Sequence, residues 1–352
     1  MSRRSTAMFK MALSALHYTG ADGLMAPLTR GVGVIFTLHN VVPQRPGRFE
    51  PNRILKITPE FLETAITQVQ ATGFDVVSLD EAHYRLCEGE HSRPFACFTF
   101  DDGYRDNYLH AYPVFQKHQL PFAVYVPTDY PDGKGELWWL ALERAIALLD
   151  GLGVNMDGQI RNFKCATPDE KVAAYHHIYW WLRSIPERDA REAVREICRS
   201  SGIDHAELCG ELIMSWDEIR QMARDPLVTI GAHTRSHLAL AKLTAAEARQ
   251  EMWDSVVRLE RELGQPCRHF SFPYGDETSA GEREFALAKE MGMKTAVTTR
   301  KSLVHAEHLN KLTGLPRLSL NGDYQHSRYL KVLLSGVPFA LWRMVRQVTP
   351  VS

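Results

Sequence analysis

The sequence predicts an α/β fold: a distorted, TIM-like (β/α) barrel of seven or eight units with a helical insertion. Two observations predict it. Short apolar runs of strand length alternate along the chain with segments that begin at helix caps. No glycine-rich nucleotide-binding turn follows the first apolar run, which favours a closed barrel over an open sheet. In a parallel barrel the functional side chains gather at the carboxyl ends of the strands.

The individual elements follow in chain order. Thr58, with a proline after it, is a typical helix start, and Gly73 ends that helix. Thr244 opens a capping box, and the long helix that it begins ends at Gly264. Two more helices are expected beside the barrel, at 107–118 and 280–291. Strands are expected at 32–38, 75–79, 96–100, 122–126, 227–232, 269–272 and 295–299, with 316–320 as an eighth or an edge strand.

A long interval between the fourth and fifth predicted strands divides the barrel into two parts. This interval holds no convincing strand and is too long for a simple crossover, so it predicts a helical insertion. We expect five segments, namely an N-terminal helical segment (1–30), the first part of the barrel (31–130), the insertion (131–214), the second part of the barrel (215–322) and an amphipathic C-terminal tail (323–352).

Aromatic residues are frequent in the insertion. Trp138 and Trp139 are candidates for stacking on a sugar ring, the alternative being the core of the inserted helices. The later aromatic residues recur at helical spacing and are predicted to be core; they are Tyr175, Tyr179, Trp180 and Trp181.

Composition excludes several classes of function. The 352 residues include 41 Lys and Arg against 42 Asp and Glu, so no global basic field would attract nucleic acid. The six cysteines form no CxxC pair, which predicts reduced thiols rather than a disulfide scaffold. No apolar run is long enough for a transmembrane helix, and no clear signal peptide is present. We therefore expect a cytoplasmic protein, at the inner membrane face if the acid-free tail after Asp323 lies on a membrane instead of packing on the barrel.

The first of three polar motifs closes the third strand. Residues 99–103 read Thr-Phe-Asp-Asp-Gly, with two adjacent acids where a strand ends. Adjacent side chains point in different directions, so one of Asp101 and Asp102 can ligate a metal while the other takes a proton. The same letters also form ordinary turns, and the motif alone does not decide the function.

The other two motifs follow the fifth and sixth strands. His233 and His237 are four residues apart, which would place them on one face of a helical turn, at a spacing that suits one divalent ion. Pro273, Tyr274 and Gly275 would form a rigid wall of a pocket. One acid with two histidines is a metal-binding set that leaves coordination positions open, and a second acid beside it can activate water. The combination indicates a hydrolase of a neutral acyl bond.

The three motifs together resemble the NodB-homology polysaccharide deacetylases, carbohydrate esterase family 4. The family's TFDDG motif is complete at 99–103, its H-[ST]-x-x-H motif at 233–237, and its proline-aromatic-glycine motif at 273–275. The resemblance covers about residues 32–320 without the insertion.

The resemblance implies a role for each motif residue. Asp101 would be the catalytic base, and Asp102, His233 and His237 would hold the metal, usually zinc, with cobalt, manganese or nickel also used. The metal would polarise the acetyl carbonyl, and the backbone N–H of Tyr274 would help to hold the oxyanion.

The sequence departs from the family pattern in two places. Many members carry an arginine where this chain has Ser271, so the arginine that orients the base must come from elsewhere, with Arg317 or, second, Arg268 as candidates. Residues 303–305 match the letters of the last family motif but lie in a polar loop, which leaves the general acid unassigned. His39 ends the first strand and is expected at the barrel mouth.

The resemblance predicts removal of N-acetyl groups, with release of acetate, from a polysaccharide, a chitooligosaccharide or a lipid-linked sugar that contains N-acetylglucosamine. Two alternatives stay open. One is hydrolysis of an O-acetyl ester or another non-peptide C–N bond on the same fold, and the other is a non-catalytic glycan-binding module. The expected partners are an N-acetylated glycan or lipid-linked sugar and, through the C-terminal tail, a membrane surface; nucleic acid is not expected.

Overall fold

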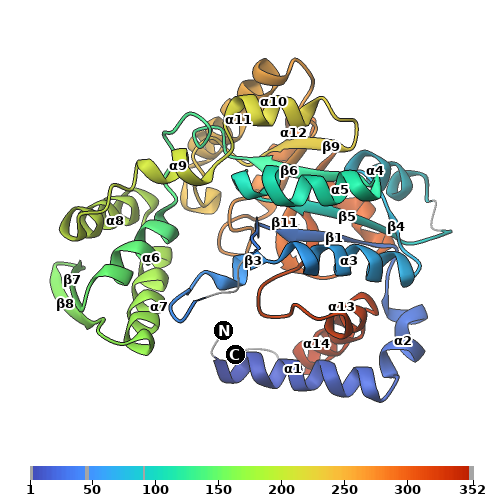
Figure 1. Cartoon of the computed structure of the whole chain (residues 1–352). Coiled ribbons are helices and arrows are strands. Elements are labelled where there is room, and N and C mark those ends of the chain that lie inside the picture. The colour runs from blue at the N-terminus through green and yellow to red at the C-terminus, as the bar shows by residue number, and fades with distance from the viewer. Residues whose placement is uncertain (1–2, 44–46, 90–91, 349–352) are drawn as a thin grey trace.

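Seven parallel strands close into a barrel. The structure is a computed structural model that describes residues 3–43, 47–89 and 92–348, with the side chains of 3, 4 and 345–348 left out. The barrel order is β1 (Gly33–Leu38), β12 (Leu315–Ser319), β11 (Thr295–Lys301), β10 (His269–Ser271), β9 (Val228–Ala232), β6 (Phe122–Val126) and β5 (Phe95–Phe100), which pairs again with β1. Helices surround these strands (Figure 1), so the predicted distorted (β/α) barrel is confirmed.

The run predicted as a strand at 75–79 is the main departure within the barrel. Only β4 (Asp75–Val76) is extended there, and it shares one edge of β5 with β6, pairing beside Phe95 and Ala96 while β6 pairs beside Thr99 and Phe100. The Ser78 side chain then accepts a hydrogen bond from the Glu81 amide and begins α4 (Leu79–Glu88). The barrel therefore closes with seven strands, and the run predicted at 316–320 supplies an interior one, β12.

The helices begin and end largely where their caps predict. Thr58 caps α3 (Pro59–Ala71), and Thr244 forms the capping box of α11 (Ala245–Leu263), which Gly264 ends in the left-handed conformation. The helix predicted at 107–118 begins as a π-helical turn (Asn107–Ala111) and continues as α5 (Tyr112–His118). The remaining elements around the barrel are β2 (Asn40–Val41), β3 (Lys56–Ile57), α10 (Trp216–Ala223), α12 (Glu282–Glu290) and the 3-10 turns η1 (Arg53–Leu55), η3 (Leu240–Lys242) and η4 (Ala306–Gly314).

The core has two layers because side chains alternate along each strand. Outward-facing residues such as Phe98 and Phe100 pack against Phe115 of α5. Inward-facing residues such as Cys97 and Tyr125 fill the barrel. Polar groups take over from apolar ones at the carboxyl end of the barrel, which is where a site was expected.

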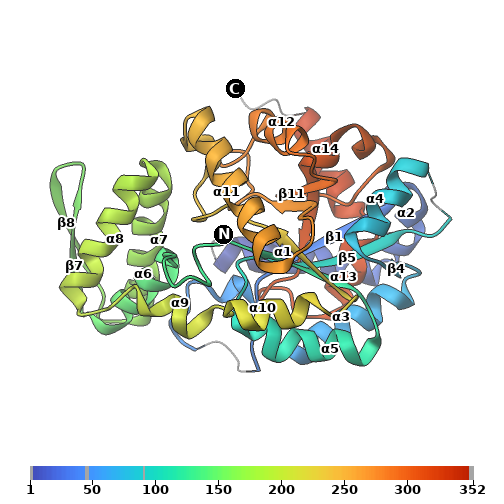
Figure 2. The ribbon, with the colours of Figure 1, turned by 90° about the horizontal axis from the view of Figure 1, so that it is seen from above.

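The insertion folds around a hydrophobic cluster of its own and projects from one side of the barrel (Figures 1 and 2). It comprises α6 (Trp138–Leu148), β7 (Gly151–Met156), β8 (Gln159–Lys164), α7 (Pro168–Ser184), α8 (Glu187–Ser201) and α9 (Glu207–Leu212). The prediction that this interval holds no strand is wrong. β7 and β8 form an antiparallel hairpin that turns at Asp157 and Gly158, both with positive φ, and alternate residues of β7 are buried.

The two ends of the chain pack together as one layer. α1 (Arg3–Tyr18) packs against α13 (Ser327–Leu334), and α2 (Ala21–Thr29) packs against α14 (Val337–Val348). The Thr29 hydroxyl donates a 2.6 Å hydrogen bond to the Ser335 carbonyl. In Figure 1 this layer lies below the barrel. Residues 1–2 and 349–352 of the two predicted end segments lie outside the described residues. Among the described helices, none is long and apolar enough to cross a membrane.

Candidate active site

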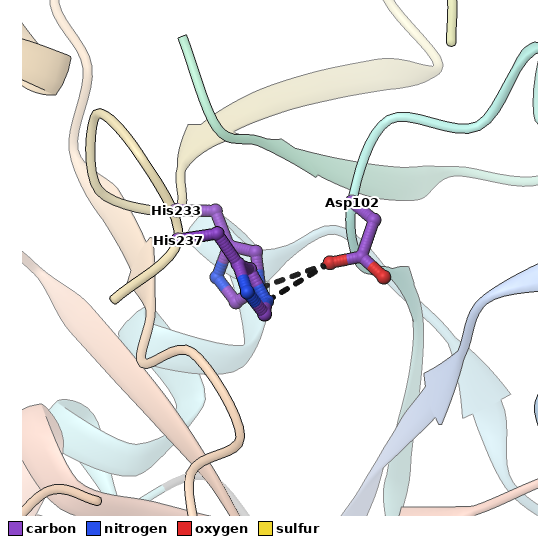
Figure 3. Close-up of side chains that lie close together, drawn as sticks. All are labelled: Asp102, His233 and His237. Carbon is purple, nitrogen blue, oxygen red and sulfur yellow. Dashed lines mark ion pairs between the residues drawn. The ribbon is translucent and has the colours of Figure 1, made fainter. Parts of the chain in front are cut away.

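Three predicted metal ligands meet at the carboxyl end of the barrel. The Oδ1 atom of Asp102 lies 3.2 Å from Nε2 of His237 and 3.5 Å from Nε2 of His233 (Figure 3). One candidate ligand atom from each side chain lies within 4.8 Å of the others, and all three residues are buried. Asp102 follows β5 and the two histidines follow β9. These two strands lie on either side of β6 in the barrel, so their carboxyl ends are close together.

The chemistry of these side chains fits a divalent ion. The His233 Nδ1 atom donates a 2.6 Å hydrogen bond to the Ser271 carbonyl, which directs its Nε2 atom at Asp102. Burial lowers the pKa of His237, which keeps its ring neutral near pH 7 despite the charge of Asp102. The Oδ1 atom of Asp102 is buried and has no hydrogen-bond partner among the described residues. Acceptor atoms that converge in this way, away from water, are typical of a metal site.

The two histidines are not on a helical turn, which corrects one expectation. Residues 233–237 form an irregular loop, in which Thr234 and His237 have φ values of 62° and 59°. The Thr234 hydroxyl accepts a 3.0 Å hydrogen bond from the His237 amide, and Arg191 of α8 donates one of 3.1 Å to the His237 carbonyl. Thr234 and His237, together with Asp102 and Tyr274, are four of the six non-glycine residues with positive φ in the described chain. Such backbone strain concentrates at functional sites.

The predicted base lies beside this cluster and is held from across the barrel. Arg317 of β12 donates two hydrogen bonds to Asp101, of 2.8 Å to Oδ1 and 2.6 Å to Oδ2. Its guanidinium also donates to the hydroxyls of Thr99 and Ser271, and its Nε atom donates to the Thr298 carbonyl. Burial raises the pKa of Asp101, but the charge of Arg317 and its hydrogen bonds outweigh burial, so the pKa is below its usual range. Asp101 is therefore a carboxylate at neutral pH.

Of the three residues of the predicted pocket wall, Tyr274 lines the pocket that also contains Asp101, Asp102 and both histidines, whereas Pro273 and Gly275 shape the turn beside it. Tyr274 lies with its ring 4.9 Å from that of His237, and its hydroxyl accepts a 2.7 Å hydrogen bond from Trp138 Nε1. Pro273 is buried beside it. Gly275 has a φ of 62°, and a Cβ atom there would lie 2.6 Å from the Thr299 amide, so the turn requires glycine.

Comparison with known proteins bears directly on this site. A family model described as polysaccharide deacetylase matches residues 173–296, which contain both histidines and the pocket wall. Over these residues the chain is similar to that family. No curated protein matches it.

Several solved structures share the fold of this chain. The deacetylase PplD of Streptococcus pyogenes, solved with acetate, is 16% identical with a TM-score of 0.54, over 82% of this chain and 92% of that one. IcaB from Ammonifex degensii is 17% identical with a TM-score of 0.52, over 87% and 97%. A de-N-acetylase from Aggregatibacter actinomycetemcomitans is 16% identical with a TM-score of 0.51, over 85% and 98%.

Among the other candidates from the sequence, His39 lies at the site and two residues do not. His39 lines the same pocket as Asp101, and burial lowers its pKa, so its ring is neutral near pH 7. His305 is at the opposite end of the barrel, because Val304 pairs with Gly33 at the start of β1. Arg268 is exposed where β10 begins. The letters of residues 303–305 thus match the family's last motif without its position.

The insertion completes the pocket around these residues. The pocket has a volume of about 340 Å³, and α7 supplies part of its wall. Trp180 is 63% exposed there, which corrects the expectation that it belongs to the core. Trp138 and Trp139 are buried, and only Trp139 lines the pocket.

Two arginines of the insertion were not found from the sequence. Arg183 of α7 lines the pocket, with its guanidinium 3.8 Å from the ring centre of Tyr274, and donates to Asp276 and Ser279. Arg191 supports the histidine loop. Nothing in the local sequence distinguishes them from surface arginines, since their partners are distant along the chain.

Proposed function

We propose that this protein is a metal-dependent de-N-acetylase that releases acetate from an N-acetylglucosamine-containing glycan. One observation carries the proposal: Asp101, which is paired with the buried Arg317, lines the same pocket as Asp102, His233 and His237. Asp102 and the two histidines would hold the ion, and we propose zinc, with cobalt, manganese or nickel as other fits. When bound, such an ion supplies Lewis-acid activation of the acyl group and of water.

The chain's own residues account for the proton transfers. Asp101 is a carboxylate and takes a proton from the attacking water as the C–O bond forms. It then gives that proton to the leaving nitrogen as the C–N bond breaks, which leaves acetate and a free amine. Arg317 keeps both Asp101 oxygens in place through this cycle, and the Tyr274 backbone N–H is our proposed oxyanion donor. We propose His39 as a positioning group, which its place in the pocket lining supports.

The pocket wall supports a sugar substrate. Trp180 presents an exposed ring, and Tyr179 stacks on Trp138 with centroids 5.1 Å apart. Aromatic faces of this kind suit the apolar face of a pyranose ring. Two similar structures are described as a deacetylase with acetate and as a de-N-acetylase, which supports removal of an N-acetyl group here. A chitooligosaccharide or a lipid-linked sugar would fit the pocket.

A substrate panel tests this proposal. Purified protein reconstituted with zinc is given chitin oligomers, a lipid-linked N-acetylglucosamine and acetylxylan, and acetate is measured. We expect acetate from at least one N-acetylated substrate. Acetate from acetylxylan alone would favour an O-acetyl esterase, and glycan binding without any acetate would favour a non-catalytic binding module. We also propose a cytoplasmic location and contact between the C-terminal tail and a membrane.

A further inference from the structure

The outer face of the N-terminal helices is apolar and exposed. On α1, Met8 is 66% exposed, Met11 is 64% and Tyr18 is 73%. With Ala15 they follow the spacing of three and four residues that places side chains on one face of a helix. On α2, Leu24 and Leu28 are 80% and 81% exposed. We call these residues of α1 and α2 the α1–α2 surface.

Charged groups are nearly absent from this part of the described chain. Among the described side chains of residues 5–29, the charged ones are Lys10 and Asp22. Asp22 is 2% exposed and faces inward, 4.0 Å from Lys331 of α13 and 3.8 Å from His17. The inner face of α1 packs on α13 through buried residues such as Leu13. The α1–α2 surface is thus an apolar face with no covering element in the described chain, which usually marks an interaction site.

The charges around this surface identify its partner. Residues 1–29 and 324–352 contain seven Lys and Arg but one acid, the buried Asp22. Lys331 and Arg343 are exposed on the helices that pack against α1 and α2. α14 also exposes Leu341 and Met344. Exposed apolar side chains with exposed basic ones on the same layer of helices complement an anionic phospholipid surface.

We infer that the α1–α2 surface docks this protein onto an anionic lipid bilayer. The docking is peripheral, because helices α1, α2, α13 and α14 lie as a layer on one side of the molecule (Figure 1) and none of the described helices crosses a membrane. It extends the predicted membrane contact from the C-terminal tail to the N-terminal helices, which supply most of the apolar face.

The helical layer that contains the α1–α2 surface contributes to a cavity that adjoins the proposed active-site pocket. A second cavity, lined by Thr6 of α1 together with Arg48 and Arg53, shares Pro51, Ile54 and His176 with the catalytic pocket. A sugar attached to a membrane lipid could therefore pass from the layer to the pocket. This link rests on the proposed function, whereas the docking itself does not.

Vesicle binding tests the inference. Full-length protein is sedimented with phosphatidylcholine vesicles that contain either no phosphatidylglycerol or about one-third of it. We expect binding to the anionic vesicles that falls as salt is added. The double variant Leu24→Glu/Leu28→Glu should bind about tenfold more weakly or worse, because two apolar side chains become charged. Ile160→Glu is the matched control: Ile160 is 74% exposed, but on the hairpin of the insertion, and this variant should bind like the wild type.

The outcomes separate this inference from its rivals. Equal vesicle binding by the double variant and the wild type, or no binding by either, would overturn it. So would a wild-type dimer in light scattering that the double variant converts to a monomer, because the surface would then join two copies of the chain. Circular dichroism checks that each variant is folded. Acetate release from a soluble oligomer is measured on the same samples, so failure of docking and failure of the deacetylase proposal give different results.

Discussion

Arg317 donates a hydrogen bond to each carboxylate oxygen of Asp101, of 2.8 Å to Oδ1 and 2.6 Å to Oδ2, from a strand that lies 216 residues further along the chain. Both residues are almost fully buried, at 1% and 2% exposure. A buried pair of this kind adds little net stability, but removing one partner leaves an uncompensated charge. Its value here is that it keeps Asp101 ionised and fixed beside the proposed metal ligands.

Arg317 variants should change the pH profile of the reaction. Without the guanidinium, burial of Asp101 is no longer opposed, so its pKa rises. The acid limb of kcat/KM should therefore move to higher pH in Arg317→Met, with a loss of about 10- to 100-fold at neutral pH. Arg317→Lys keeps the charge but not the two-pronged geometry and should show a smaller shift. An unmoved acid limb in Arg317→Met would contradict the positioning role.

The two adjacent acids should separate metal binding from proton transfer. Asp101→Asn should lower kcat by about 10²- to 10⁴-fold while the protein still binds its ion, because Asp101 is outside the ligand set. Asp102→Asn should lose the ion itself. Metal content by elemental analysis and acetate release, measured on both variants, distinguish the two roles. Equal metal loss in both variants would show that the acids share one role.

The exposed ring of Trp180 should matter for substrate binding. Trp180→Ala should raise KM for a chitin oligomer several-fold and leave kcat nearly unchanged, since the ring lies in the pocket wall and not at the reacting atoms. Trp253→Ala is the matched control, because Trp253 is 51% exposed on α11 and does not line this pocket. A fall in kcat without any change in KM would argue against a sugar-binding wall.

Asp106 should make stability depend on pH. Burial raises its pKa to about 7, although the Val41 amide, Asn40 and Asn107 donate to its carboxylate. In the unfolded chain the pKa is about 3.9, so between about pH 4 and 7 the folded protein binds the extra proton. Stability is thus lost as pH rises through this window.

Comparison with Asp106→Asn measures this effect. From about pH 5 to 8, the free energy of unfolding of the wild type should fall relative to the variant, by about 1 to 4 kcal/mol. Urea unfolding at several pH values gives the difference directly. Parallel curves for the two proteins would mean that Asp106 is ionised throughout.

The barrel and the site residues were accessible to sequence analysis because their signals are local. Motifs at the strand ends predict Asp102, His233 and His237. The family pattern has an arginine at the position of Ser271, and its absence here points to Arg317 as the replacement. The shape of the histidine loop was not accessible: the letters are the same for a helical turn and for a loop with His237 at positive φ.

The insertion shows the other limit. The Asp157–Gly158 turn and the alternation of Leu152, Val154 and Met156 are local signals of a hairpin, but the stronger helical pattern around them predicts helices alone. Trp180 and Arg183 depend instead on how α7 meets the barrel. That contact joins distant parts of the chain, and helical periodicity cannot tell a core face from a pocket wall.

The most direct measurement is acetate release as a function of zinc added to chelated protein, with bound zinc determined on the same samples. We expect no activity without the ion and activity that rises in proportion to zinc up to one ion per chain. The Asp101→Asn variant should bind the same ion and release almost no acetate. Full activity in metal-free protein, or an Asp101→Asn variant as active as the wild type, would contradict the proposed function.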